Sequence, residues 1–87
     1  MNTIKLSNIP LSDFRRFLED MGCICVATSK GRGGHEKWRK QGILRPITLQ
    51  THVDPVAEQC VKSNLRTLGL TRTDFEKWFL SQNKKKK

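Results

Sequence analysis

The sequence has no long apolar run, few acidic residues and only three cysteines. No stretch approaches the roughly 20 apolar residues that a membrane-spanning helix needs, and the first ten residues lack the apolar core of a secretory signal peptide. These absences predict a cytoplasmic protein. The odd number of cysteines and their spacing match neither a disulfide framework nor a standard zinc motif, so we expect reduced thiols and no metal site.

The chain is short, with 87 residues of which 36% are hydrophobic. This length fits one domain, which we place at residues 1–83, followed by a basic tail at 84–87 that we expect to be disordered. A core of this modest size leaves little room for a deep enzyme pocket. Any chemistry is therefore expected on the surface.

Positive charge is the strongest compositional signal. The chain has 17 Lys and Arg residues against 8 acids, and subtracting the four tail lysines from the net charge of +9 leaves +5. Residues 30–40 contain one acid, Glu36, and five basic side chains: Lys30, Arg32, Lys37, Arg39 and Lys40. Such crowding on one short segment indicates a polyanionic partner.

Apolar spacing predicts the order of elements. A helix is expected over residues 11–21, followed by strands over 23–29, 35–40 and 44–53. Asp54 and Pro55 suit the N-cap and first position of a second helix that ends at Gly69. Thr71 and Asp74 resemble a capping box that opens a short last helix. The sequence therefore predicts an α+β fold of order α-β-β-β-α with an added C-terminal helix.

Three antiparallel strands with helices on one face leave the other face open. Alternation along the second strand assigns Trp38 to the core and His35, Lys37 and Arg39 to the open face. In the third strand Ile47 and Leu49 belong to the core by the same rule, and the side chains assigned to the open face are Thr48, Gln50 and His52. Both histidines are thus expected beside basic side chains.

The Gly-Gly-His sequence that ends at His35, the later His52 and the Asp54-Pro55 pair together resemble the HicA (YcfA-like) family of mRNA interferase toxins. The resemblance covers about residues 8–75. It implies a double-stranded-RNA-binding-domain-like fold, cleavage of mRNA without a metal or other cofactor, and a HicB-like antitoxin as partner. The family's active histidine corresponds to His35, and His52 resembles a second family histidine through a looser alignment. Glu36 stands where many members have another histidine.

RNA carries its own nucleophile, the 2′-hydroxyl, so a protein needs only to move protons and neutralise phosphate charge. Histidine titrates near neutral pH and serves either proton role. We therefore predict that His35 is catalytic, with His52 as a candidate second catalytic residue. The predicted RNA-binding residues are Lys30, Arg32, Gly33, Gly34, Lys37, Arg39 and Lys40.

Two functions of different class are compatible with these residues. The first is the RNA-cleaving toxin, and the alternative is a non-catalytic module that binds structured RNA, for which the fold and charge suffice. DNA binding is less favoured, since no predicted helix has a dense basic face that could read bases. Without catalysis, His35 is a turn residue bonded to the backbone, and His52 a hydrogen-bonding residue at the end of the third strand.

Overall fold

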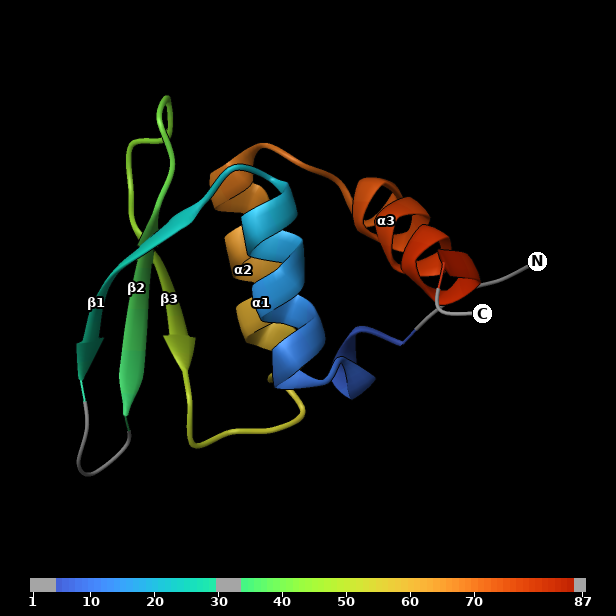
Figure 1. Ribbon diagram of the computed structural model, residues 1–87, viewed down its shortest axis with the longest axis horizontal. Helices are drawn as coiled ribbons and strands as arrows, with labels where there is room; N and C mark the ends of the chain where they lie inside the picture. The colour runs from blue at the N-terminus through green and yellow to red at the C-terminus, as the bar shows by residue number, and fades with distance from the viewer. Residues whose placement is uncertain (1–4, 30–33, 86–87) are drawn as a thin grey trace.

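The computed structural model describes residues 5–29 and 34–85. A single-turn 3₁₀ helix, η1 (Leu6–Asn8), precedes α1 (Leu11–Asp20), and α2 (Glu58–Leu68) and α3 (Arg72–Lys85) end the chain. Between α1 and α2 lie β1 (Ile24–Ser29), β2 (His35–Arg39) and β3 (Ile47–Gln50) (Figure 1). This confirms the predicted α-β-β-β-α order with an added helix. No helix in the described part of the chain is long and apolar enough to cross a membrane.

The strands form one open antiparallel sheet in the order β1-β2-β3. In the register of the sheet, His35 lies opposite Ser29 on one side and Gln50 on the other. Near the other end of β2, Trp38 is paired with Cys25 and Ile47. A bulge between Cys25 and Ala27 interrupts the β1–β2 ladder. The residues before and after the bulge still share a face of the sheet with their partners on β2, although strict alternation along β1 is broken there.

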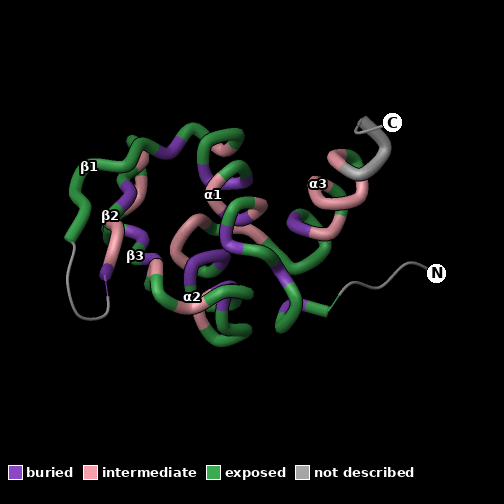
Figure 2. Tube along the Cα trace, turned by 60° about the horizontal axis from the view of Figure 1, so that its bottom comes forward, coloured by how far each residue is buried: buried purple, intermediate pink, exposed green. Residues whose placement is uncertain are grey.

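The core lies between the sheet and α1 and α2. Trp38, Ile47 and Leu49 are buried as the alternation predicted, while Lys37 and Thr48 are exposed. The helices contribute the remaining large buried side chains, which include Phe14, Phe17, Leu18, Val61 and Leu65. Because α1 and α2 both lie on one side of the sheet (Figures 1 and 2), the face that carries the side chain of Lys37 stays open.

β1 is an edge strand that the helices do not cover. All six of its residues are exposed, and Figure 2 shows it as a continuous exposed segment at the far side of the sheet from α2. The exposed fractions of Ile24 and Val26 are 67% and 55%. The apolar content of β1 therefore reflects strand formation and not core packing, which the sequence pattern alone did not distinguish.

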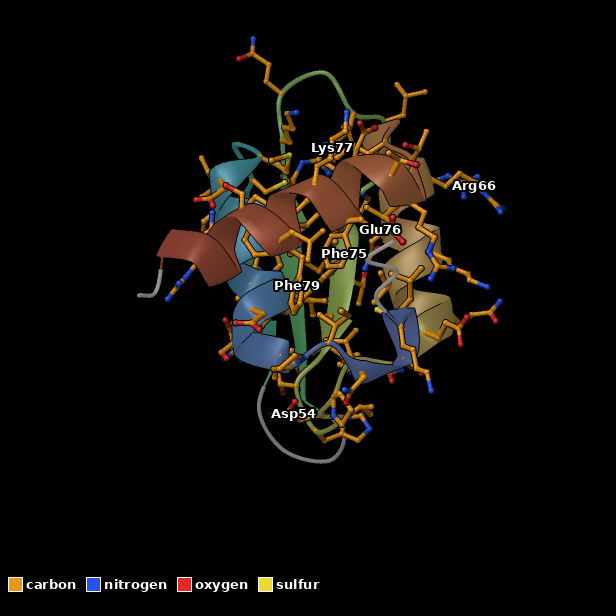
Figure 3. All side chains as sticks on the ribbon, turned by 90° about the vertical axis from the view of Figure 1, so that its right-hand side faces the viewer. Asp54, Arg66, Phe75, Glu76, Lys77 and Phe79 are labelled. Atoms are coloured by element: carbon orange, nitrogen blue, oxygen red, sulfur yellow. The ribbon has the colours of Figure 1, made fainter. Side chains whose placement is uncertain are left out.

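α3 completes the core on the other side of α1. The ring of Phe75 is fully buried and meets Phe17 edge to face at 4.7 Å between centroids. Trp78 donates from Nε1 to the Asp20 carboxylate at 2.7 Å, which fastens α3 to the end of α1. Figure 3 looks onto α3 and shows Phe75 and Phe79 on one edge of it. The helix is longer than the predicted short one, because it continues through Lys85.

The predicted N-cap of the second helix is wrong. α2 begins at Glu58 with Ala57 at the N-cap, and the Asp54-Pro55 peptide bond is cis. The Asp54 carboxylate instead accepts a hydrogen bond of 2.9 Å from the backbone N–H of Leu11, the first residue of α1. Asp54 therefore caps a helix 43 positions earlier in the chain, where the preceding residue, Pro10, has no side-chain acceptor.

The third strand is also shorter than predicted, spanning Ile47–Gln50 instead of residues 44–53. Pro46 has no backbone N–H to continue the ladder toward Arg45. At the other end the chain turns, and the N–H of Val53 donates to the carbonyl of Gln50 at 3.3 Å. His52 consequently lies in this turn and not in the strand.

Candidate functional site

The two histidines meet at one end of the sheet. His35 is the first residue of β2, and His52 lies in the turn after β3, in the order expected from the antiparallel pairing of His35 with Gln50. Their ring centroids are 6.2 Å apart and their planes cross at 74°. Neither ring is buried. The structure therefore brings together the two residues that the sequence singled out for proton transfer.

Gly34 fixes the turn that carries His52 against the start of β2. The N–H of Thr51 donates to the carbonyl of Gly34 at 2.8 Å. A Cβ atom at Gly34 would lie 2.6 Å from the Thr51 hydroxyl oxygen and 2.9 Å from the carbonyl oxygen of Ser29. This position needs glycine because there is no space for a side chain.

Gly34, one of the predicted RNA-binding residues, is buried, and the other six divide into three groups. Lys37 and Arg39 are exposed and follow His35 on the open face of β2. Lys40 lies beyond the other end of β2, where its side chain runs beside Gly22, so it does not join the histidines. Lys30, Arg32 and Gly33 lie outside the described residues.

Glu36 lies on the core side of β2, and its charge is matched by a cation that sequence reasoning did not assign. Arg15 of α1 donates to Glu36 from Nε at 3.1 Å and from Nη2 at 2.9 Å. Trp38 Nε1 also donates to Glu36, at 3.2 Å. The side chain of Glu36 is only 13% exposed and that of Arg15 37%. The signal was present in the sequence: an acid predicted on a core-facing position requires a cationic partner.

Arg15 and Glu36 line a shallow hollow of about 360 Å³ whose wall also includes His52. Nε and Nη2 of Arg15 donate to Glu36, and Nη1 has no hydrogen-bond partner among the described residues. A guanidinium held at two points in this way is preorganised, so it loses little side-chain entropy when it binds an anion. The hollow thus adds a fixed cation beside His52, whereas His35 does not line it.

Cys23 and Cys60 do not contribute an activated nucleophile. All three are free thiols, with Cys23 buried, Cys60 half-buried and Cys25 exposed. Burial raises the pKa of Cys23 and, against a weaker opposite effect of the Asn64 hydrogen bond, the pKa of Cys60. A raised pKa keeps these two thiols protonated near neutral pH. In the described part of the chain, no three His, Cys, Asp or Glu side chains cluster as metal ligands.

No protein-family model, curated protein or solved structure matches this chain.

Proposed function

We propose that this protein binds RNA on the open face of its sheet and cleaves it at the His35–His52 pair. The observation that carries the proposal is the 6.2 Å separation of the two imidazole rings at one end of that face. Two imidazoles at this spacing can contact the two oxygens that exchange protons when a phosphodiester is cut, because each contact needs about 3 Å.

The proposed reaction uses the RNA as its own nucleophile. One histidine accepts the proton of the 2′-hydroxyl, and the 2′-oxygen forms a bond to the adjacent phosphorus. The bond from phosphorus to the 5′-oxygen breaks, and the other histidine donates a proton to that oxygen. The products are a 2′,3′-cyclic phosphate and a 5′-hydroxyl, so the mechanism requires no metal ion. Chelators are therefore expected to leave the rate unchanged.

The charges around the pair suit this chemistry. Lys37 is exposed two positions from His35 on the same face, and Arg15 lies in the hollow that His52 borders. Cations fixed beside a phosphate stabilise the extra negative charge that develops in the transition state. Arg39 extends the basic face along β2, where it would hold a further phosphate of the strand.

The fold supports an RNA ligand at a coarser level. Three antiparallel strands with helices on one face follow the α-β-β-β-α order of double-stranded-RNA-binding domains, and we propose that the fold is of this type. The proposed class is accordingly a HicA-like toxin that acts on mRNA in the cytoplasm. A second candidate, a non-catalytic binder of structured RNA, is favoured by the same open basic face but assigns the histidines no role.

A HicA-like toxin needs an inhibitor in the same cell, and we propose a HicB-like antitoxin with an acidic surface. Arg39 lies opposite Ile24 in the β1–β2 register, so exposed apolar and basic side chains share the open face. An acidic partner with apolar residues would complement both. If it covers His35 and Lys37, RNA and antitoxin compete, and a ternary complex with undiminished RNA affinity would contradict this arrangement.

The decisive experiment compares three variants of the purified, partner-free protein. His35→Ala and His52→Ala are each expected to reduce cleavage by roughly 10²-fold or more, as is typical for loss of an acid or base. Gln50→Ala is the matched control, because Gln50 is exposed opposite His35 but has no acid–base function. Thermal melting and RNA binding should remain close to wild type in all three, since the substituted side chains are not buried.

The nucleophile is tested in the substrate. An RNA with one deoxyribose just 5′ of the cut should bind normally and remain intact. Full cleavage by His35→Ala would contradict the enzyme proposal, and so would the inability of the wild-type protein to cut any RNA. If RNA is bound but never cut, the non-catalytic binder is the correct function.

A further inference from the structure

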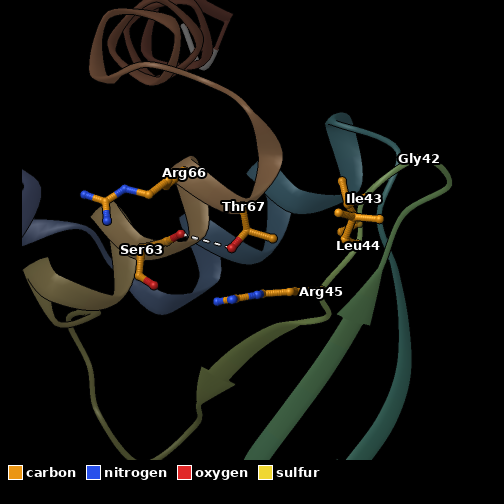
Figure 4. A pocket seen from close by; sticks show the side chains of 7 residues that line it. All are labelled: Gly42, Ile43, Leu44, Arg45, Ser63, Arg66 and Thr67. Carbon is orange, nitrogen blue, oxygen red and sulfur yellow. Dashed lines mark hydrogen bonds between the residues drawn. The ribbon is translucent and has the colours of Figure 1, made fainter.

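A basic hollow lies at the end of the sheet away from the histidines. It measures about 470 Å³ and is formed by the β2–β3 loop on one side and the second half of α2 on the other (Figure 4). Two arginines, Arg45 and Arg66, line it together with the hydroxyl side chains of Ser63 and Thr67. No carboxylate belongs to its lining.

Neither arginine has an acidic partner in the described part of the chain. The ion pairs in this part of the chain join Arg15 to Glu36, Lys62 to Glu58 and Arg72 to Glu76. Glu58, the one acid of α2, is thus matched by Lys62 within the same helix. The positive charge of Arg66, one turn after Lys62, remains uncompensated, as does that of Arg45. An unpaired pair of arginines beside two hydroxyl groups is a chemistry that recognises phosphate.

The side chains are placed for a shared ligand. In Figure 4 the side chain of Arg45 reaches from the loop toward α2, and Ser63 lies between the two arginines in this view. The Thr67 hydroxyl donates to the carbonyl of Ser63 at 3.2 Å, which orients the Thr67 oxygen. The Ser63 hydroxyl has no hydrogen-bond partner among the described residues. Figure 3 shows Arg66 projecting from α2 into open solvent, where an extended polymer can approach.

The two sites are at opposite ends of the sheet. His35 begins β2 and Arg45 follows its other end, so the five residues of β2, about 16 Å at 3.3 Å each, separate them. Stacked nucleotides advance about 3.4 Å each along a strand. At this rise the 16 Å span corresponds to about five nucleotides. A stacked RNA of three nucleotides at the histidines therefore does not reach Arg45, whereas a 16-nucleotide RNA does.

We propose that Arg45 and Arg66, with Ser63, form a second phosphate site that holds the RNA backbone remote from the cut. This inference rests on the proposed RNA-binding function and extends it by assigning the footprint. The site contributes to binding and not to proton transfer. It therefore makes the protein prefer long RNA over short fragments.

The test uses the double variant R45Q/R66Q. Its matched control is R16Q/K77Q, which removes the same charge from two exposed residues of α1 and α3 that line neither hollow. For 16-nucleotide RNA, R45Q/R66Q should bind roughly tenfold or more weakly at low salt, and the slope of log affinity against log salt should fall by about 1 per arginine. Its KM for the long substrate should rise while kcat stays within about twofold, and cleavage of three-nucleotide RNA should equal wild type.

Each outcome decides between the proposals. If R45Q/R66Q and R16Q/K77Q lose affinity equally, or if long and short RNA are affected alike, the second site is wrong while cleavage at the histidines stands. If RNA is bound with the expected dependence on Arg45 and Arg66 but is never cut, the second site stands and the enzyme proposal fails. If wild type binds no RNA, both are overturned.

Discussion

Arg15 and Glu36, 21 positions apart, form a two-point ion pair that joins α1 to β2 behind the histidine pair. Glu36 lies on the core side of the sheet, and its carboxylate holds the Arg15 guanidinium in place beside the candidate site. The position of the ion pair also shows how the helix layer and the open face are coupled: α1 supplies a cation that borders the same hollow as His52.

The ion pair should contribute measurably to stability. Glu36→Gln is expected to lower the free energy of unfolding by about 1 kcal/mol, since Arg15 is partly exposed and water screens the pair. Arg15→Gln should cost more, because it leaves the charge of Glu36 with little solvent and no cation. Urea unfolding of both single variants and the double variant measures the coupling, and strictly additive effects would show that the pair contributes nothing.

Gly34 is predicted to be intolerant of any side chain. Gly34→Ala should destabilise the protein by roughly 1–3 kcal/mol, because its Cβ meets the Thr51 hydroxyl and the Ser29 carbonyl. Adding Thr51→Ala removes the nearer of these contacts, so the double variant should recover part of the loss. Denaturant unfolding measures both effects. A stable Gly34→Ala protein with unshifted His52 resonances would contradict the assignment.

Asp54 should stabilise α1 and not α2. Asp54→Ala removes the acceptor for the Leu11 N–H and is expected to cost about 1 kcal/mol, while Asp54→Asn keeps an acceptor and should cost less. Amide hydrogen exchange locates the effect: exchange should accelerate in the first turn of α1. Acceleration confined to the start of α2 would instead restore the cap predicted from the sequence.

The capping box of α3 predicts a pH dependence. Asp74 accepts from the backbone N–H and the hydroxyl of Thr71, and these hydrogen bonds lower the pKa of its carboxyl below the ordinary value. A depressed pKa in the folded state stabilises the fold above the unfolded pKa, and this contribution disappears as the pH falls through the folded pKa. Asp74→Asn should therefore reduce the melting temperature at pH 7, and its difference from wild type should vanish in strong acid.

The sequence predicted those parts of the fold that depend on local chemistry. Gly69 ends α2 in the left-handed conformation, with φ of 73°, and Thr71 and Asp74 cap α3 as their spacing suggested. Trp38 and Ile47 are buried because strand alternation is a local rule. Asp54 was misassigned because its partner, Leu11, lies 43 positions away, and no local pattern reports a contact of that separation.

The sequence identified the two histidines of the candidate site but not the distance between them. Alternation placed His35 on the open face, yet only the turn after β3 determines that His52 lies 6.2 Å from it. Arg15 and Arg45 were missed because a cation on a helix or a loop has the same sequence appearance whether it is solvated or borders a hollow.

The open face of the sheet predicts a salt dependence of RNA binding. Lys37 and Arg39 are exposed and lie on the side of β2 that the helices do not cover, so both can contact phosphates of one strand. The variant K37Q/R39Q should lower the slope of log affinity against log salt by about 1–2, since each phosphate neutralised contributes about 0.7–0.9. R16Q/K77Q, which removes equal charge elsewhere, should change the slope less. Fluorescence anisotropy with labelled RNA at four or more salt concentrations measures both slopes.

Because Lys37 is next to the histidines and Arg39 is not, Lys37→Gln alone should also lower kcat for cleavage, whereas Arg39→Gln should raise KM only. Salt-independent binding by the wild-type protein, or identical slopes for the two double variants, would show that RNA does not lie on this face.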